Sequence, residues 1–202
     1  MKGTGLFRPR LVFSADRAEA ARTAEADKAA RFRQAMLVHM DAAYNLARYL
    51  ARDATIAEDI VQDAFLRAYR GFESWRGEAP KYWLLAIVRK CHLDHVAATR
   101  KGRPAASLDD WADAPPPQLV ESHNPESLLA EKDEAVMLRT SIEQLPEPFR
   151  ETLVLRELEE LSYKEIAAIT EVPIGTVMSR LARAREMLHN LLIPGGRREA
   201  RS

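Results

Sequence analysis

Apolar residues recur at the three- and four-residue spacing of an α-helix over most of the chain. Between Phe32 and Arg103 there are two such stripes, which are made of Leu37, Met40, Tyr44, Ala47 and Leu50 and of Ile60, Ala64, Phe65, Ala68 and Tyr69. A face that is apolar at this period packs against neighbouring helices. The pattern resumes after Leu128, and no segment alternates with the period of two that a β-strand requires. The sequence therefore predicts an all-α fold.

Proline and acidic residues interrupt the helical pattern between the two stretches. Pro115, Pro116 and Pro117 follow one another there, and such a run cannot continue a helix. We predict two small helical domains joined by a flexible acidic, proline-rich linker. The predicted bounds are 1–31 for an N-terminal extension, 32–103 for the first domain, 104–130 for the linker, 131–193 for the second domain and 194–202 for a basic tail.

The extension over residues 1–31 is rich in Ala, Arg and Glu and has only a thin apolar stripe. Such a segment forms a frayed helix or stays disordered. Nothing in it indicates chemistry, so we assign it no function.

Composition excludes several classes of protein. The 202 residues are 47% hydrophobic and 30% charged, which is typical of a soluble globular chain. There is no apolar run of about 18 residues and no signal peptide, so we expect a cytoplasmic protein. A single cysteine excludes an internal disulfide, and the chain has no nucleophile motif, HExxH or nucleotide-binding loop. We predict a protein that is not an enzyme and that uses no cofactor, metal or small-molecule substrate.

The net charge is zero, but charge is segregated along the chain. Seven basic residues stand against two acidic ones over 76–103, and six stand against two over 176–201. Between these segments, residues 104–134 contain eight acidic residues and one basic residue. Two basic surfaces separated by an acidic strip suggest two contacts with a polyanion.

The segment ELSYKEIAAITEVPIGTVMSRLARARE has the features of a helix-turn-helix. Ser162 and Glu165 form a capping-box pattern at the start of the first helix, and Pro173 ends that helix. Thr176 is the expected N-cap of the second helix, whose apolar stripe is Val177, Leu181, Ala184 and Leu188. Its outer face carries Ser179, Arg180, Arg183 and Glu186. Hydroxyl and guanidinium groups so placed suit the DNA major groove, and the alternative is a solvated arginine face on a helical hairpin.

Two motifs together carry a family resemblance. One is Asp59-x-x-Gln62-Asp63-x-Phe65, and the other is Pro173-x-Gly175-Thr176-Val177-x-Ser179-Arg180-Leu181. In this order and at this separation they resemble the extracytoplasmic-function (ECF) sigma factors of the sigma-70 family, over about 36–103 and 134–192. The resemblance implies a transcription initiation factor. Its implied partners are core RNA polymerase (the β′ and β subunits), promoter DNA and an anti-sigma factor.

The resemblance also implies roles for particular residues. The helix AEDIVQDAFLRAYR is similar to the family segment that binds a coiled coil on β′, so the implied core-binding residues are Asp59, Gln62, Asp63 and Phe65. The three polar residues stand at i, i+3 and i+4 and share one helix face. A merely solvated acidic face is the alternative. In the second domain, the implied minus-35 residues are Thr176, Ser179, Arg180, Arg183 and Arg185.

The segment FESWRGEAPKYWLLAIVRKCHLDHVAATRK resembles the part of the family that melts and reads the minus-ten element. Single-strand binding requires cations that hold phosphates and aromatic rings that stack on unpaired bases. The implied minus-ten residues are Trp75, Arg76, Lys81, Tyr82, Arg89 and Lys90. Trp83 stands one turn before Ile87 and is expected in the core, whereas Lys81 is expected at the surface.

Some positions depart from the family pattern. Lys90 stands where asparagine is usual, Met178 where Lys or Arg is common, and Glu171 where glycine often makes the turn, so we assign no base to Met178. Separately, the helical spacing of Cys91, His92 and His95 permits a metal or redox role. No second ligand cluster accompanies them, and a solvated helix face is the alternative.

Two other functions fit parts of the sequence. A helix-turn-helix regulator would bind DNA without core polymerase, and a decoy with sigma-like domains would bind polymerase or an anti-sigma factor without opening a promoter. The acidic linker either enters the polymerase channels as a mimic of nucleic-acid charge or serves only as a tether.

Overall fold

The computed structural model describes residues 12–99 and 130–193. Every regular element within these ranges is a helix, which confirms the all-α prediction. The first range contains α1 (Val12–Met36), η1 (Leu37–His39), α2 (Met40–Ala51), α3 (Ala54–Gly71), η2 (Phe72–Ser74) and α4 (Pro80–Thr99). The second contains α5 (Ala130–Gln144), α6 (Glu147–Leu153), the π-helical turn η4 (Val154–Leu158), α7 (Tyr163–Thr170) and α8 (Ile174–Leu192). The predicted basic tail and nearly all of the predicted linker lie outside the described residues.

Helices α2, α3 and α4 pack on one another to form the first domain. The Asp53 carboxylate starts α3 by accepting a hydrogen bond from the backbone N–H of Ile56 at 2.9 Å. Much of the buried side of these helices is alanine, which lets the helix axes approach closely, and larger side chains fill the remaining space. The buried apolar residues of α2, α3 and α4 are Ala43, Leu46, Ala47, Leu50, Ala57, Ile60, Ala64, Ala68, Leu84, Leu85, Val88 and Cys91.

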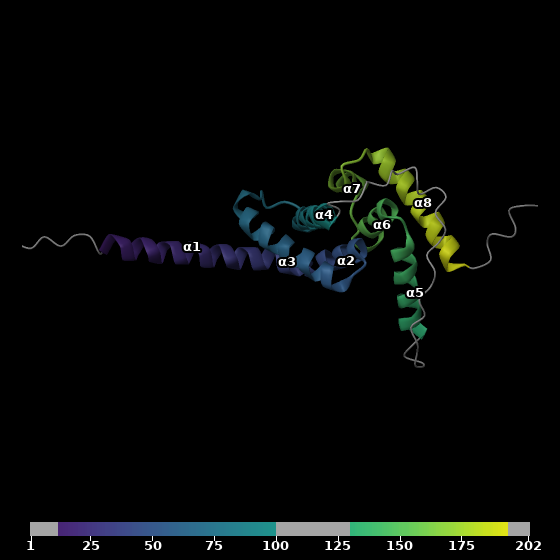
Figure 1. Cartoon of the computed structure of the whole chain (residues 1–202). Coiled ribbons are helices and arrows are strands. Elements are labelled where there is room, and N and C mark those ends of the chain that lie inside the picture. Colours follow the sequence, from purple (N-terminus) through teal and green to yellow (C-terminus); the bar gives the residue numbers. More distant parts are fainter. Residues whose placement is uncertain (1–11, 100–129, 194–202) are drawn as a thin grey trace, which may run out of the picture.

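Helix α1 is a single 25-residue helix that extends away from the rest of the molecule (Figure 1). Its C-terminal end belongs to the core, since Phe32 and Met36 are buried. The preceding turns also touch the first domain, because Tyr69 donates a hydrogen bond to Glu25 and the Lys28 ammonium lies 4.6 Å from the centre of the Tyr69 ring. The helical alternative for the extension thus holds from Val12 onward, and residue 31 lies inside a helix.

The second domain packs α5, α6 and α7 on α8. Its buried apolar side chains come from every helix and include Ile142, Leu145, Leu155, Ile166 and Leu181. Arg150 is also buried, and its guanidinium donates to the carbonyl oxygen of Leu145 at 2.6 Å. Burial lowers the pKa of Arg150 to about 10.

The two domains are in contact in this structure. Helix α2 lies against α6 and η4, and α4 lies against α7 (Figure 1). No helix in the described parts of the chain combines the length and the apolar character needed to cross a membrane.

Candidate polymerase and nucleic-acid interfaces

The polar face of α3 is open at two of its four predicted positions. Asp59 and Gln62 are exposed, and Leu66 beside them is half exposed. Asp63 is partly exposed and forms an ion pair with Arg67 at 2.7 Å. Phe65 is half-buried and meets the ring of Phe32 edge-on at 6.3 Å between centroids. We call the accessible surface formed by Asp59, Gln62 and Leu66 the α3 face. Phe65 packs beneath this face against Phe32.

Trp75 belongs to an aromatic stack between η2 and α4. Its ring is nearly parallel to that of Phe72 at 5.6 Å and to that of Trp83 at 5.7 Å. Its indole N–H donates to the carbonyl oxygen of Glu78 at 2.9 Å. Trp83 is half-buried and packs against the core, as does Tyr82. The stack fixes Trp75 as a rigid wall at the N-terminal end of α4.

An open pocket of about 530 Å³ lies beside this wall. One side of it is formed by α1 with Arg31, Gln34 and Ala35. The other side is formed by Phe72, Glu73, Trp75, Arg76 and Gly77, so one carboxylate stands among the guanidinium groups. An aromatic wall flanked by two guanidinium groups suits an unstacked base and its phosphate. Sequence reasoning missed Arg31 because it assigned no function to residues 1–31, and it missed Gln34 because Gln34 belongs to neither motif of the family resemblance. Their position next to the buried Phe32 is the signal that could have found them.

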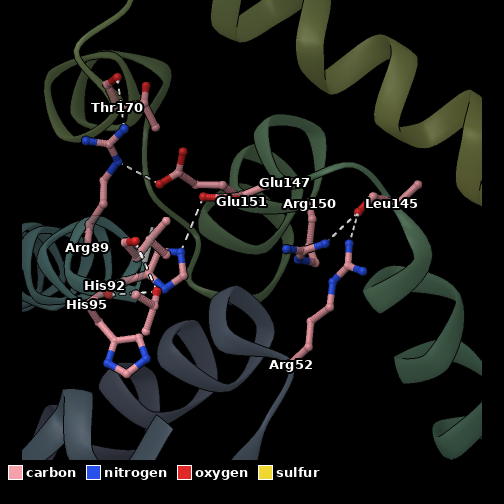
Figure 2. A network of polar contacts seen from close by, with 11 residues as sticks. Arg52, Arg89, His92, His95, Leu145, Glu147, Arg150, Glu151 and Thr170 are labelled. Carbon is pink, nitrogen blue, oxygen red and sulfur yellow. Dashed lines mark hydrogen bonds and ion pairs between the residues drawn. The ribbon is translucent and has the colours of Figure 1, made fainter. Parts of the chain in front are cut away.

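Lys81 and Arg89, two of the predicted minus-ten cations on α4, contact the second domain. The Lys81 ammonium donates to the carbonyl oxygen and to a carboxylate oxygen of Glu159, each at 2.8 Å. The Arg89 Nε–H donates to Glu151 at 2.7 Å, and a second nitrogen lies 3.4 Å from the carbonyl oxygen of Thr170 (Figure 2). Burial raises the pKa of Glu151, while the Arg89 guanidinium opposes that shift. Lys90 and Arg76, by contrast, are exposed.

Three further polar contacts join the same two domains. His92 Nε2 lies 3.3 Å from a carboxylate oxygen of Glu147, and Arg52 donates to the carbonyl oxygen of Leu145 at 3.0 Å (Figure 2). Arg48 pairs with Glu143 at 3.0 Å. In every one of these contacts the first domain supplies the basic group, and the second domain supplies a carboxylate or a carbonyl oxygen.

The helix-turn-helix is present as predicted over α7 and α8. Ser162 and Glu165 form the capping box, with the Ser162 N–H donating to the Glu165 carboxylate at 2.8 Å. Glu171 ends α7 in the left-handed conformation with φ of 58°, which explains why glycine suits this turn. The predicted Thr176 N-cap is wrong. Helix α8 already begins at Ile174, because the Pro173 carbonyl oxygen accepts from the N–H groups of Thr176 and Val177.

The predicted minus-35 residues divide between two sides of α8. Thr176, Ser179, Arg180 and Arg183 stand at i, i+3, i+4 and i+7 and share one face. Ser179 and Arg183 are exposed on it. Arg185 points elsewhere, because its guanidinium makes hydrogen bonds of 2.6 and 3.1 Å with Glu157 of η4. Arg185 is thus held within the domain, away from the shared face.

Cys91, His92 and His95 do not converge. Cys91 and His92 are buried, and His92 faces Glu147. Burial raises the pKa of the Cys91 thiol to about 11. No group of three potential metal ligands occurs within residues 12–99 or 130–193.

Comparison with protein-family models matches the described domains. The family described as Sigma-70 region 2 matches residues 37–102, and the family described as Sigma-70, region 4 matches residues 135–188. These ranges coincide with the α2–α4 bundle and with the domain that contains the helix-turn-helix.

Among characterised relatives, the chain is similar to ECF RNA polymerase sigma-E factors. It is 41% identical to that of Escherichia coli (strain K12) over 141 residues, which cover 67% of this chain and 73% of the relative. It is 37% identical to that of Haemophilus influenzae over 155 residues, which cover 74% and 80% of the two chains.

Two solved structures have a similar fold. The sigma factor RpoE in complex with the anti-sigma factor NepR from Bartonella quintana aligns with a TM-score of 0.58 and 27% identity, over 80% of this chain and 96% of that one. CnrH in complex with the cytosolic domain of CnrY aligns with a TM-score of 0.57 and 23% identity, over 85% and 94%. The second likeness concerns the fold alone.

Proposed function

The chain belongs to the ECF group of sigma-70 factors, the RNA polymerase subunits that direct promoter-specific initiation, and we propose how its surfaces divide that work. In this proposal the α3 face binds core polymerase, α4 and the neighbouring pocket hold the opened minus-ten element, and α8 reads the minus-35 element. The factor acts by binding, without catalysis of its own, in the cytoplasm where polymerase and promoters are found.

The proposed core-binding role of α3 is supported by exposure and by rigidity. Asp59 and Gln62 present polar groups on a helix whose opposite side is fixed in the core by Ala57, Ile60 and Ala64. Such a helix keeps its shape when a partner docks, so little freedom is lost on binding. The exposed Leu66 adds an apolar contact at the edge.

The pocket between α1 and η2 is the observation that carries the proposed minus-ten role. Its lining combines the fixed Trp75 ring with Arg31 and Arg76. A base taken out of the duplex loses stacking energy, which an aromatic wall restores, and the guanidinium groups hold the adjoining phosphates. Lys81, Tyr82, Arg89 and Lys90 continue this surface along α4.

For the minus-35 element we propose that the shared face of α8 enters the major groove. Arg183 is exposed there and has the reach for the two acceptors of a guanine edge.

We further propose control by an anti-sigma factor. One of the similar structures is a sigma factor in complex with an anti-sigma factor. The partner would compete with polymerase for the α3 face or stabilise a compact arrangement of the two domains.

Run-off transcription with purified components tests the proposal. The chain should pull down core polymerase and then start transcripts at a cognate promoter. DNA binding without polymerase binding would favour a helix-turn-helix regulator, and polymerase binding without transcripts would favour a decoy.

A further inference from the structure

We propose that helix α1 positions Tyr69 for the binding of core polymerase, and that Glu25 is the residue of α1 through which it does so. Tyr69 extends the α3 face by one further contact. The inference rests on the proposed function, in which Asp59, Gln62 and Leu66 of the α3 face bind polymerase.

Tyr69 follows the α3 face at the spacing of a helical seam. Asp59, Gln62, Leu66 and Tyr69 stand at i, i+3, i+7 and i+10 of α3. Side chains at these positions lie along one side of a helix, and a helix meets a coiled-coil partner at the same spacing. Asp59 and Gln62 are exposed, Leu66 is half exposed, and Tyr69 is partly exposed. A helical partner that lies along α3 therefore reaches Tyr69 about one turn after Leu66.

One side of α1 holds the Tyr69 side chain from its ring to its hydroxyl. Glu25, Lys28 and Phe32 stand at i, i+3 and i+7 and share that side of the helix. Phe32 meets the Tyr69 ring edge-on at 5.1 Å between centroids, and the Lys28 ammonium lies 4.6 Å from the centre of the ring. The Tyr69 hydroxyl donates a hydrogen bond to the Glu25 carboxylate. These contacts fix both the ring and the hydroxyl.

Helix α1 is anchored in the core, so it is a rigid support for Tyr69. Phe32 and Met36 are buried near its C-terminal end, and Glu25 lies two turns before Phe32 on the same continuous helix. Beyond Glu25 the helix runs away from the first domain (Figure 1). A free surface tyrosine loses rotamer freedom when a partner covers it, whereas a tyrosine that is already fixed does not. The contact with α1 thus lowers the entropic cost of binding at Tyr69.

The tyrosine side chain fits a helical partner of defined character. Its large ring and its hydroxyl make tyrosine one of the residues that contribute most to protein interfaces. Leu66 next to it is apolar, whereas Asp59 and Gln62 are polar. The matching helix of polymerase carries basic or polar side chains opposite Asp59 and Gln62 and apolar ones opposite Leu66 and Tyr69.

The test is the titration of core polymerase with full-length variants. Tyr69→Ala should weaken binding about tenfold, because it removes an interface ring. Glu25→Ala should weaken binding about threefold, because the Tyr69 side chain must then be ordered on binding. Glu25→Gln keeps an acceptor for the hydroxyl, so its affinity should stay within about twofold of the wild type.

Glu19→Ala is the matched control on the same helix. Glu19 is an exposed carboxylate that stands nine residues before Lys28 and so lies on the opposite side of α1. It should bind polymerase as the wild type does. Tyr69→Phe removes only the hydroxyl and should cost as much as Glu25→Ala. Adding Glu25→Ala to Tyr69→Phe should cause no further loss, because both changes break the same hydrogen bond.

Three results would overturn the positioning role of Glu25. One is wild-type affinity in Glu25→Ala, and another is a further loss when Glu25→Ala is added to Tyr69→Phe. The third is a Glu25→Gln variant as weak as Glu25→Ala, which would mean that polymerase recognises the charge of Glu25 directly.

Comparison with the α3 face separates this inference from the proposed function. Weak binding by Asp59→Ala with Gln62→Ala, together with normal binding by Tyr69→Ala, would overturn the inference and leave the proposed function standing. Normal binding by both variants would overturn the two together. Tyr69→Ala also loses packing against Phe32, so urea unfolding checks that it is folded. The Glu25 variants and Tyr69→Phe alter only a surface hydrogen bond, and they decide the matter if Tyr69→Ala is unfolded.

Discussion

The two proposed binding faces of the first domain differ in how accessible they are. Asp59 and Gln62 on α3 are exposed, whereas Lys81 and Arg89 on α4 are held by the second domain. Both faces match the same family model. A motif therefore indicates what a surface can bind, and only the arrangement of the whole chain decides whether the surface is free.

Charge explains why the second domain covers one face and leaves the other. The surface that it presents is acidic through Glu143, Glu147, Glu151 and Glu159. That surface attracts the cations of α2 and α4 and repels the carboxylates of α3.

The largest expected effect is on the α3 face, which the second domain leaves exposed. Asp59→Ala with Gln62→Ala should weaken binding to core polymerase by about 3 kcal/mol, roughly 150-fold in Kd, because both polar groups sit on one exposed rigid face. Titration of labelled core polymerase measures this, and circular dichroism checks that helicity is retained.

Asp41→Ala is the matched control, since Asp41 is an exposed carboxylate of the same domain that lies on α2 and outside the α3 face. It should leave the affinity unchanged. A variant with Glu151→Gln and Glu159→Gln should also bind core polymerase normally. If the double alanine variant binds as tightly as the wild type, the α3 face is not the polymerase site.

The next effect concerns Cys91, which lies on α4 near Arg67 and Asp63 of α3. Burial raises its pKa from 9.0 to about 11, so the thiolate fraction at pH 8 falls from about one in ten to about one in a thousand. Alkylation by iodoacetamide should be about a hundredfold slower in the native chain than in urea. Since the protonated thiol is favoured by folding, this protection holds below pH 9 and is lost as the pH rises towards 11.

The variant with Glu151→Gln and Glu159→Gln extends the Cys91 measurement to the contact between the two domains. Packing within the first domain protects the thiol, so separating the domains should leave the alkylation rate unchanged. A rate that rises in this variant would mean that the second domain shields α4 on both sides.

Local features were predictable from the sequence. The capping box of Ser162 and Glu165 and the apolar stripe of Val177, Leu181 and Ala184 depend on residues within one or two turns. The structure confirms both the capping box and the apolar stripe. Thr176 failed as an N-cap because the competing cap, the carbonyl oxygen of Pro173, lies only three residues away and has no sequence signature of its own.

The covered face was not predictable in this way. Arg89 and Glu151 are 62 residues apart, and Lys81 and Glu159 are 78 residues apart. Pairing over such distances follows from the relative position of two domains, which no local pattern encodes. The same reason hid the pocket, because Arg31 comes from α1 and Trp75 from the segment that follows η2.

A smaller effect is expected on α8, where Arg183 is exposed on the shared face and Arg185 is paired with Glu157. Arg183→Ala should cost about 1–3 kcal/mol at the cognate minus-35 element, since an exposed Arg can hold a guanine edge. Arg185→Ala is the control, because Arg185 pairs with Glu157 inside the domain, and it should change affinity by less than about 0.5 kcal/mol. Binding to single-base variants of the element measures both. A loss that is equal on all sequences would assign Arg183 to phosphate and not to base reading.

The smallest expected effect concerns Glu171, in the turn that Arg89 contacts through the Thr170 carbonyl oxygen. Glu171 follows Thr170, whose carbonyl oxygen lies near the Arg89 guanidinium, and it adopts φ of 58°. Glu171→Gly removes roughly 1 kcal/mol of left-handed strain but adds freedom to the unfolded chain, so the free energy of unfolding should change by less than about 0.5 kcal/mol. Ala168→Gly, at an exposed interior position of the same helix, should lower it by about 0.5–1 kcal/mol. Urea unfolding compares the two variants, and small-angle X-ray scattering should find both as compact as the wild type, because neither change removes a side chain that joins the two domains. If Glu171→Gly destabilises as much as Ala168→Gly, the turn does not depend on the left-handed conformation, and its position beneath Arg89 must be fixed by other contacts.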